Sequence, residues 1–205
     1  MFEIIRNGGP VMYPLLFCSL LTLTVIIERC IFWAGIELRR NRGLLDEVLE
    51  LCRVGDWPAV RERTVGSRDY VLRVLVSGIL HREFSMVRAM EAAALAEFKK
   101  MRRYMGVLDT MITVAPLLGI FGTVLGIISS FEVLGTAGLE EPHLVTAGVA
   151  QALITTATGL GIAILSVFPY NYFNARIEHA AQTIEKYATS LEIVYEKLEV
   201  KGEQP

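Results

Sequence analysis

Two long uncharged runs, rich in small and hydroxylated residues, constrain what this chain can fold into. The first extends from Thr110 to Phe131 and the second from Leu144 to Tyr170. Each is longer than the about 20 residues that a helix needs to cross a bilayer. Gly, Ala and Thr let helix backbones approach closely and place hydroxyl groups inside the membrane. The runs therefore predict transmembrane helices that are built to contact other helices.

A third apolar run, near the N-terminus, predicts another membrane span. It is uncharged from Asn7 to Ile27 and ends in Glu28-Arg29. The run is too long for the apolar core of a signal peptide, so we expect it to remain as a membrane helix. The predicted spans are about 13–36, 109–132 and 144–170, with Glu28 and Arg29 near an interface or paired within the bundle. A hydrophobic share of 53% and a mean hydropathy of +0.44 fit an integral membrane protein.

The remaining segments read as helices, so the predicted fold class is all-α. We expect cytoplasmic helices over about 37–106 and 171–200, the second being an amphipathic continuation of the third span. Gly55-Asp56-Trp57-Pro58 and the polar turn Gly66–Asp69 predict breaks in the first of these segments. Ser85 is placed to cap a helix that continues through Lys100 to Phe131, in one unbroken piece with the second span.

Basic residues near the spans predict the orientation in the membrane. Lys and Arg lie at both ends of the segment between spans one and two and after span three, whereas the linker Glu132–His143 has neither. Because Lys and Arg concentrate on the cytoplasmic side, the N-terminus and Gly135–Glu141 are expected outside and the C-terminus inside. The net charge of -2 argues against nucleic acid as a partner.

Small residues in the second and third spans predict close helix packing. Ala115, Gly119, Gly122 and Gly126 follow steps of four, three and four, which keeps them on one face of span two. Gly159 belongs to a second such stripe, in span three. This spacing is typical of tight helix contacts, with a partner either within this chain or in another chain.

Hydroxyl and amide groups cluster in the same two spans. A lone threonine in a membrane helix commonly bonds only to a carbonyl one turn back. Clustering favours a hydrated or proton-handling surface, because an intramembrane polar group is costly without partners. Thr and Gln cannot take up and release protons near neutral pH, so another chain would have to supply a titrating group. The cluster comprises Thr110, Thr113, Thr123, Gln151, Thr155, Thr156 and Thr158.

No catalytic nucleophile, metal-ligand cluster or phosphate-binding loop is visible in the sequence, so we expect neither an enzyme nor a cofactor. His143, at the outer end of span three, and Asp109 and Glu132, which flank span two, are interpreted as residues that mark the ends of the spans.

Several motifs, in matching order, resemble those of a known family. Val114–Gly119 running into Gly122–Gly126 resembles the second-span signature of ExbB, TolQ and, more distantly, MotA. Ala150–Leu153 with Thr156–Leu160, followed by Pro169-Tyr170-Asn171, resembles the third-span signature of ExbB and TolQ. Gly55-Asp56-Trp57 and the Glu28-Arg29 ending of span one also fit, so the resemblance covers nearly the whole chain as a single ExbB/TolQ-like domain.

The resemblance implies a proton-channel subunit of a motor in the bacterial inner membrane. In that family five copies surround the helices of a small ExbD- or TolR-like single-span partner, whose intramembrane Asp carries the proton. The pore-lining threonines of the family match Thr123 and Thr156. ExbB proteins often have Glu where this chain has Gln151, so a titrating role at that position is in doubt.

Helical geometry leaves two faces of span three open as the lining of a proton path. Gln151, Thr155 and Thr158 cluster on one face, whereas Thr156 lies roughly 140° around the helix from Gln151. One face would line the lumen and the other would meet a neighbouring copy; the motif match favours Thr156 for the lumen. Two other functions compete with an ExbB/TolQ-like channel: a MotA-like stator, which would have four spans, and a non-conducting membrane scaffold.

Overall fold

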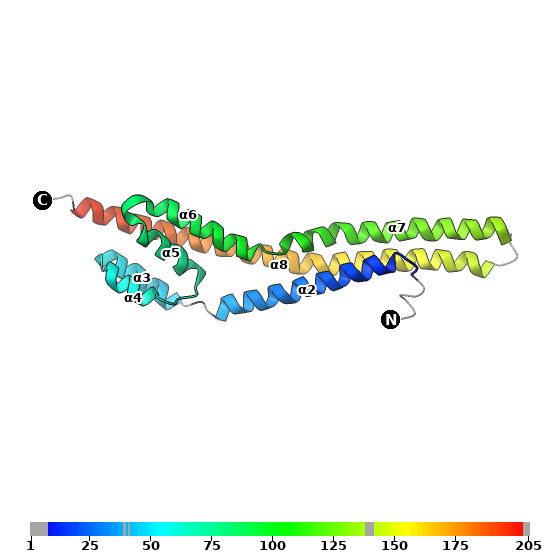
Figure 1. The fold of residues 1–205 in the computed structure, drawn as a ribbon, viewed down its shortest axis with the longest axis horizontal. Coiled ribbons are helices and arrows are strands. Elements are labelled where there is room, and N and C mark those ends of the chain that lie inside the picture. The colour runs from blue at the N-terminus through cyan, green and yellow to red at the C-terminus, as the bar shows by residue number, and fades with distance from the viewer. Residues whose placement is uncertain (1–7, 39, 41, 138–141, 203–205) are drawn as a thin grey trace. The chain divides into compact units, whose positions relative to one another are not determined.

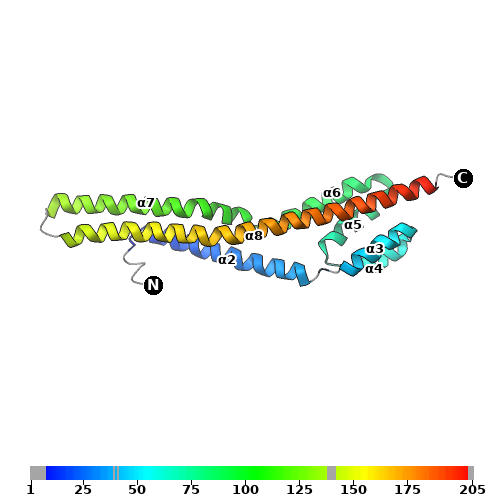
Figure 2. The same ribbon diagram turned by 180° about the vertical axis from the view of Figure 1, so that it is seen from behind.

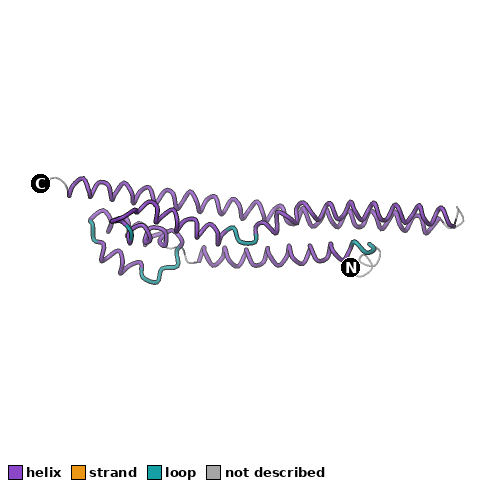
Figure 3. The backbone as a smooth tube through the Cα atoms, turned by 45° about the horizontal axis from the view of Figure 1, so that its top comes forward, coloured by secondary structure: helices purple, strands orange, loops and turns teal. Residues whose placement is uncertain are grey.

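The computed structural model describes residues 8–38, 40, 42–137 and 142–202. These residues form seven helices and no strand (Figure 3), which confirms the predicted all-helical fold class. Residues 138–141, within the linker predicted to face the outer side of the membrane, opposite the cytoplasm, are not among the described residues. The helices are α2 (Met12–Leu38), α3 (Arg42–Val54), α4 (Trp57–Thr64), α5 (Tyr70–Leu80), α6 (Arg82–Met101), α7 (Met105–Ala137) and α8 (Pro142–Gly202).

Three of the described helices are long and apolar enough to cross a membrane. The candidate spans are Met12–Leu38, Met105–Gly135 and Thr146–Leu198, and they contain all or nearly all of each span expected from the sequence. Helix α8 continues as one piece to Gly202, as the amphipathic pattern after the third span predicts.

The chain divides into two compact units, and the first contains the described residues of 1–29 and 104–173. In this unit α7 lies beside the apolar part of α8 and runs in the opposite direction (Figures 1 and 2). A core cluster joins these two helices to the start of α2, through Val11, Met12, Leu15, Ala115 and Ile162. The first unit therefore contains the apolar bundle in which the hydroxyl-rich faces meet.

The second unit contains the described residues of 30–103 and 174–205. Fully buried side chains from α3, α5 and α8 form its core, among them Leu45, Val48, Leu72, Leu75 and Leu191. Cys52 belongs to the same core, and burial raises the pKa of its thiol to about 11. This thiol therefore remains protonated at neutral pH and packs as a small apolar side chain.

Local turn chemistry explains where the helices of the second unit begin. Gly55 and Gly66 adopt φ of +79° and +78°, a conformation that glycine enters without a steric penalty. Asp56 accepts a hydrogen bond from the backbone N–H of Ala59 at 3.1 Å and caps α4. Both breaks predicted from the sequence are confirmed.

Asp69 caps α5 and accepts two backbone hydrogen bonds, whereas Asp56 accepts one. Replacement of Asp69 tests how much this cap stabilises the second unit. Its carboxylate is 2% exposed and accepts hydrogen bonds from the N–H groups of Val71 at 2.8 Å and Leu72 at 3.4 Å. We expect Asp69→Ala to cost about 1 to 2 kcal/mol, because two buried donors lose their acceptor. Asp56→Ala, which removes one exposed bond, should lower the unfolding temperature less. Equal unfolding temperatures for the two variants would show that burial of the cap contributes nothing.

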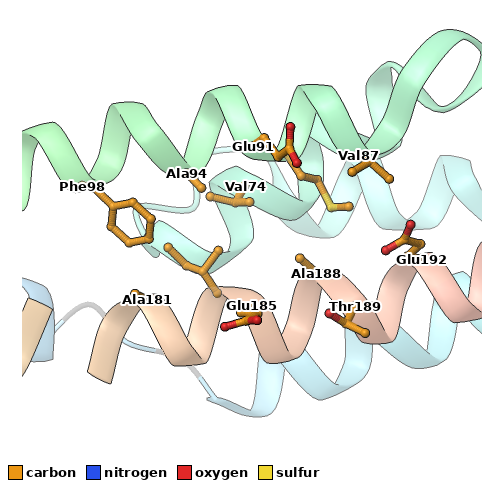
Figure 4. A pocket seen from close by; sticks show the side chains of 12 residues that line it. Val74, Val87, Glu91, Ala94, Phe98, Ala181, Glu185, Ala188, Thr189 and Glu192 are labelled. Carbon is orange, nitrogen blue, oxygen red and sulfur yellow. The ribbon is translucent and has the colours of Figure 1, made fainter. Parts of the chain in front are cut away.

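A hollow remains in the second unit between α5, α6 and α8. It has a volume of about 320 Å³ and is lined mainly by apolar side chains such as Val74, Ala94 and Ala188. Glu91 of α6 and Glu185 and Glu192 of α8 lie at its rim (Figure 4). The amphipathic face of α8 therefore does not close completely against its neighbours in this chain.

The predicted unbroken helix from Ser85 to Phe131 is wrong. Helix α6 ends at Met101, and α7 begins at Met105 after a short turn in which Tyr104 has φ of +63°. A bulky residue rarely adopts that conformation. Ser85 itself has extended angles, φ -164° and ψ 86°, and forms a kink within α6, as expected of a residue at the start of a helical segment.

A buried arginine lies beside the turn that separates α6 from α7. Arg29 is 1% exposed and donates to the Glu28 carboxylate at 2.5 and 2.6 Å. Its guanidinium also lies 5.8 Å from the centre of the Tyr104 ring, a favourable cation–π arrangement. The predicted pairing of Glu28 and Arg29 is thus observed. The contact between Arg29 and the Tyr104 ring lies at the residue whose backbone is left-handed.

Candidate functional site

Two threonine hydroxyls meet where α7 packs against α8. Thr123 of α7 and Thr156 of α8 lie within hydrogen-bonding distance of each other, and both side chains are half-buried. The Thr123 hydroxyl also lies 3.2 Å from the carbonyl oxygen of Ala152 and 3.3 Å from that of Gly119. The Thr156 hydroxyl lies 3.1 Å from the carbonyl of Gly119 on the opposite helix. These side chains therefore bridge two helices, whereas a lone threonine bonds only within its own.

The threonine pair has two hydrogen-bonded arrangements. Each hydroxyl carries one proton and accepts through two lone pairs. In one arrangement Thr156 donates to Thr123, which donates to the carbonyl of Ala152. In the other, Thr123 donates to Thr156, which donates to the carbonyl of Gly119. Both hydroxyls are satisfied in each case, so the direction of donation can reverse without movement of a heavy atom.

Small residues bring the two backbones close enough for this contact. A Cβ atom on Gly119 would lie 3.0 Å from the carbonyl oxygen of Thr155, and one on Gly122 would lie 2.6 Å from the Cβ of Thr155. The same atom on Gly126 would lie 2.8 Å from the carbonyl oxygen of Gly148. These glycines therefore face α8 of the same chain, at separations where no larger residue fits without a shift.

The remaining small residues singled out in the sequence lie on the same contact. Ala115 is fully buried, and a Cβ atom on Gly159 would meet the Ala115 backbone and lie 3.1 Å from the Cα of Gly119. Thr155 is also fully buried and donates to the carbonyl of Ala152 at 2.8 Å. Helices α7 and α8 are thus packed through small residues on both sides of the threonine pair.

Gln151 lies on a different face of α8. Its half-buried amide fills the space beside Gly9, just before α2, where any added side-chain carbon would overlap it. Gly9 has φ of +68°, a second reason why a larger residue would be strained there. The two faces distinguished by helical geometry therefore contact different parts of the chain: Thr156 meets α7, and Gln151 meets the segment before α2.

Sequence reasoning missed one hydroxyl contact between α2 and α8. The hydroxyl of Ser166 lies 3.5 Å from that of Thr22, and both side chains are buried within the apolar bundle. Sequence alone does not single out Thr22, because Ser19 and Thr24 are hydroxyl residues in the same span. The pair links the first span to the same helix that carries Thr156.

The chemistry available at this site is limited to neutral hydrogen bonding. Neither of the uncharged runs 110–131 and 144–170 contains Asp, Glu, His, Lys or Arg. In the part of the chain that the structure describes, no group of three or more His, Cys, Asp or Glu side chains is placed to hold a metal ion. Hydroxyls can orient water or hydrogen-bond to a carboxylate, but they cannot carry a proton by titration near neutral pH.

The chain is similar in sequence to one known protein family and to several known proteins. The sequence model of the MotA/TolQ/ExbB proton channel family matches residues 69–186. The chain is 34% identical to the ExbB-like 3 protein of Synechocystis sp., over 96% of both chains. It is 33% identical to the Tol-Pal system protein TolQ of Pseudomonas aeruginosa, over 72% of this chain and 63% of TolQ. It is 28% identical to the biopolymer transport protein exbB1 of Vibrio cholerae, over 78% of this chain and 72% of that protein.

Proposed function

The chain belongs to the MotA/TolQ/ExbB proton channel family, and from that premise we propose that it is the channel-forming subunit of a motor driven by the proton gradient across the bacterial inner membrane. The motor would be of the ExbB/TolQ kind and would energise an envelope or outer-membrane process. The observation that carries this proposal is the bridging pair Thr123–Thr156, set in two runs, 110–131 and 144–170, that contain no Asp, Glu, His, Lys or Arg.

A partner chain completes the proposed proton path. Since hydroxyls alone cannot bind and release protons, the carrier is a carboxylate from outside these spans. An ExbD- or TolR-like protein, with one membrane helix that carries an Asp, has the required chemistry. One hydroxyl of the Thr123–Thr156 pair would donate to this carboxylate when it is ionised, in place of its backbone carbonyl, while the other hydroxyl still donates across the pair. The pair would stabilise water beside the carboxyl group when it is protonated. A ring of copies of this chain, a pentamer by family resemblance, would enclose the partner helices.

Gln151 has a supporting role in this mechanism. Its amide packs against Gly9, so it positions the segment before α2 against the outer part of α8. A neutral amide is not a proton carrier, and we propose that Gln151 acts through packing and hydrogen bonding alone. Ala115, Gly119, Gly122, Gly126 and Gly159 would hold α7 and α8 at the separation that the threonine contact requires.

Two alternatives remain distinguishable from this proposal. A MotA-like stator would have four spans, whereas three candidate spans occur among the described residues. A non-conducting scaffold would need the small residues for packing but would give the threonine hydroxyls no role in transport. Proton conduction therefore separates the scaffold from the channel.

The proposed orientation is testable with single cysteines. We expect an impermeant thiol reagent to label Gly135→Cys in intact cells but not Glu185→Cys, because the basic residues near the spans favour a cytoplasmic C-terminus. A Cβ atom on Gly135 has no neighbour within 4 Å, and Glu185 is exposed, so neither change should disturb packing. The background should carry replacements of Cys18, Cys30 and Cys52. Labelling of Glu185→Cys alone would reverse the orientation.

The proposed assembly is testable by native mass spectrometry. The protein should be co-expressed with a single-span chain that carries an intramembrane Asp and is encoded beside it, and then purified through a tag on that chain. We expect a complex with several copies of the present chain, five by family resemblance. Purification of this chain alone, in every detergent that preserves its own oligomer, would argue against the proposed partner.

A further inference from the structure

A pocket in the second unit combines an apolar wall with a basic rim at one end of a membrane span. Its volume is about 540 Å³, and its apolar wall is formed by Ile31, Phe32, Gly35 and Ile36 of α2. Basic side chains come from Arg68, just before α5, from Arg73 in α5 and from Lys100 in α6. No part of the proposed proton path uses these residues.

The apolar wall lies where the acyl chain of a lipid would run. Ile31 is 68% exposed and lies seven residues before the end of α2, about 10 Å along the helix axis. Gly35 forms a notch in this wall, because an added Cβ atom would have no neighbour within 4 Å. A groove of this kind beside the last two turns of a membrane span suits a hydrocarbon chain.

The charges at the rim of the pocket favour a lipid whose headgroup is anionic. The lining holds three basic and two acidic side chains, a net charge of +1. Both carboxylates accept hydrogen bonds from other groups of the protein. Asp69 caps α5, and the buried Glu97 accepts hydrogen bonds from Arg73 at 2.6 Å and Lys100 at 2.8 Å. Arg73 and Lys100 nevertheless remain 45% and 55% exposed, and Arg68 is exposed as well. The accessible charge at the rim is therefore positive.

We propose that this pocket binds a phospholipid of the surrounding bilayer with an anionic headgroup, such as phosphatidylglycerol. The phosphate would lie among Arg68, Arg73 and Lys100, since guanidinium and ammonium groups bind phosphate oxygens well. One acyl chain would follow the wall of α2 past Gly35. Basic pockets beside membrane spans on the cytoplasmic side bind anionic headgroups in this way. The proposal rests on the proposed membrane orientation but not on proton conduction.

Two variants separate the headgroup contact from the chain contact. Arg68→Gln removes an exposed positive charge and leaves the Arg73–Glu97–Lys100 ion pairs intact. Gly35→Leu adds a side chain to the notch, at a position where a Cβ atom would have no neighbour within 4 Å. Arg88→Gln, at another exposed arginine, and Gly106→Leu, at another glycine with open space, are the matched controls.

The test is titration of the delipidated full-length protein with phosphatidylglycerol or phosphatidylcholine of the same acyl chains, followed by native mass spectrometry. We expect phosphatidylglycerol to bind more tightly. Arg68→Gln should weaken its binding roughly fivefold and leave phosphatidylcholine unaffected. Gly35→Leu should weaken both lipids, and the controls neither.

Three outcomes would overturn the proposal. Equal binding of the two lipids to the wild-type protein would remove the anionic selectivity. Binding of inorganic phosphate that displaces phosphatidylglycerol would identify a site for the free ion. A wild-type oligomer that binds neither lipid, and that Gly35→Leu dissociates, would show that a second copy of this chain covers the pocket. Because lipid binding is measured without a proton gradient, loss of proton flux alone would leave this proposal standing.

Discussion

Thr123→Val and Thr156→Val are each expected to reduce proton flux about tenfold or more while the complex stays assembled. Valine keeps the branched shape of threonine but removes the hydroxyl, so the substitution tests hydrogen bonding with little change in packing. The remaining hydroxyl of the pair would keep its carbonyl acceptor but lose the partner across the helix contact. The pair could then no longer reverse its direction of donation. The measurement is the decay of a pH gradient in liposomes that contain the chain and its partner.

Controls for the threonine variants come from the same two helices. Thr110 and Thr158 each donate at 2.8 Å to a carbonyl one turn back in their own helix, so valine at either position should have little effect on flux. Thr→Ser at positions 123 and 156 keeps the hydroxyl and should preserve most of the flux. Gln151→Ala should act more weakly than either valine variant. Normal flux in both valine variants, in fully assembled complexes, would leave the threonines a packing role only.

Gly122→Leu is expected to separate α7 from α8 and to prevent assembly of a stable complex. Even a Cβ atom at this position would lie 2.6 Å from the Cβ of Thr155, whose side chain is fully buried. Overpacking of this kind typically costs about 1 to 3 kcal/mol, and here it is added to loss of the threonine contact. Native mass spectrometry and the unfolding temperature of the purified variant would report the effect.

Gly161→Leu is the matched control for this variant, because it makes the same change in the apolar part of α8 where an added Cβ atom has open space. We expect Gly161→Leu to retain the oligomer of the wild-type chain. An intact oligomer with an unchanged unfolding temperature in Gly122→Leu would show that the contact between α7 and α8 has room to adjust.

Much of the fold follows from local sequence signals. Uncharged length predicts the three spans. Glycine and aspartate at residues 55–56 and 66–69 predict where α3 ends, where α4 begins and ends, and where α5 begins. The break between α6 and α7 could not be predicted in the same way, since Arg102 to Tyr104 contains neither glycine nor proline. The left-handed conformation of Tyr104 lies beside Arg29, a contact distant in sequence. The turn therefore has a tertiary contact beside it but no local sequence signal that would predict it.

For the candidate site, the sequence predicts which residues matter but not which helices they contact. Residue types and helical spacing single out Thr123, Thr156 and the glycine stripe. Spacing alone cannot say that the stripe faces α8 of the same chain, because small residues serve contacts within and between chains equally well. Nor can it decide which face of α8 meets α7. That assignment depends on the packing that sets Thr156 against Gly119 and Gln151 against Gly9.

The most direct measurement compares proton flux in three sets of liposomes: this chain alone, the chain with its single-span partner, and the chain with a partner whose intramembrane Asp is replaced by Asn. We predict rapid decay of the pH gradient only in the second set, because the uncharged runs 110–131 and 144–170 that carry the threonine pair contain hydroxyls but no Asp, Glu, His, Lys or Arg. Equally rapid decay with this chain alone, or with the Asn partner, would contradict a proton path completed by a carboxylate from another chain.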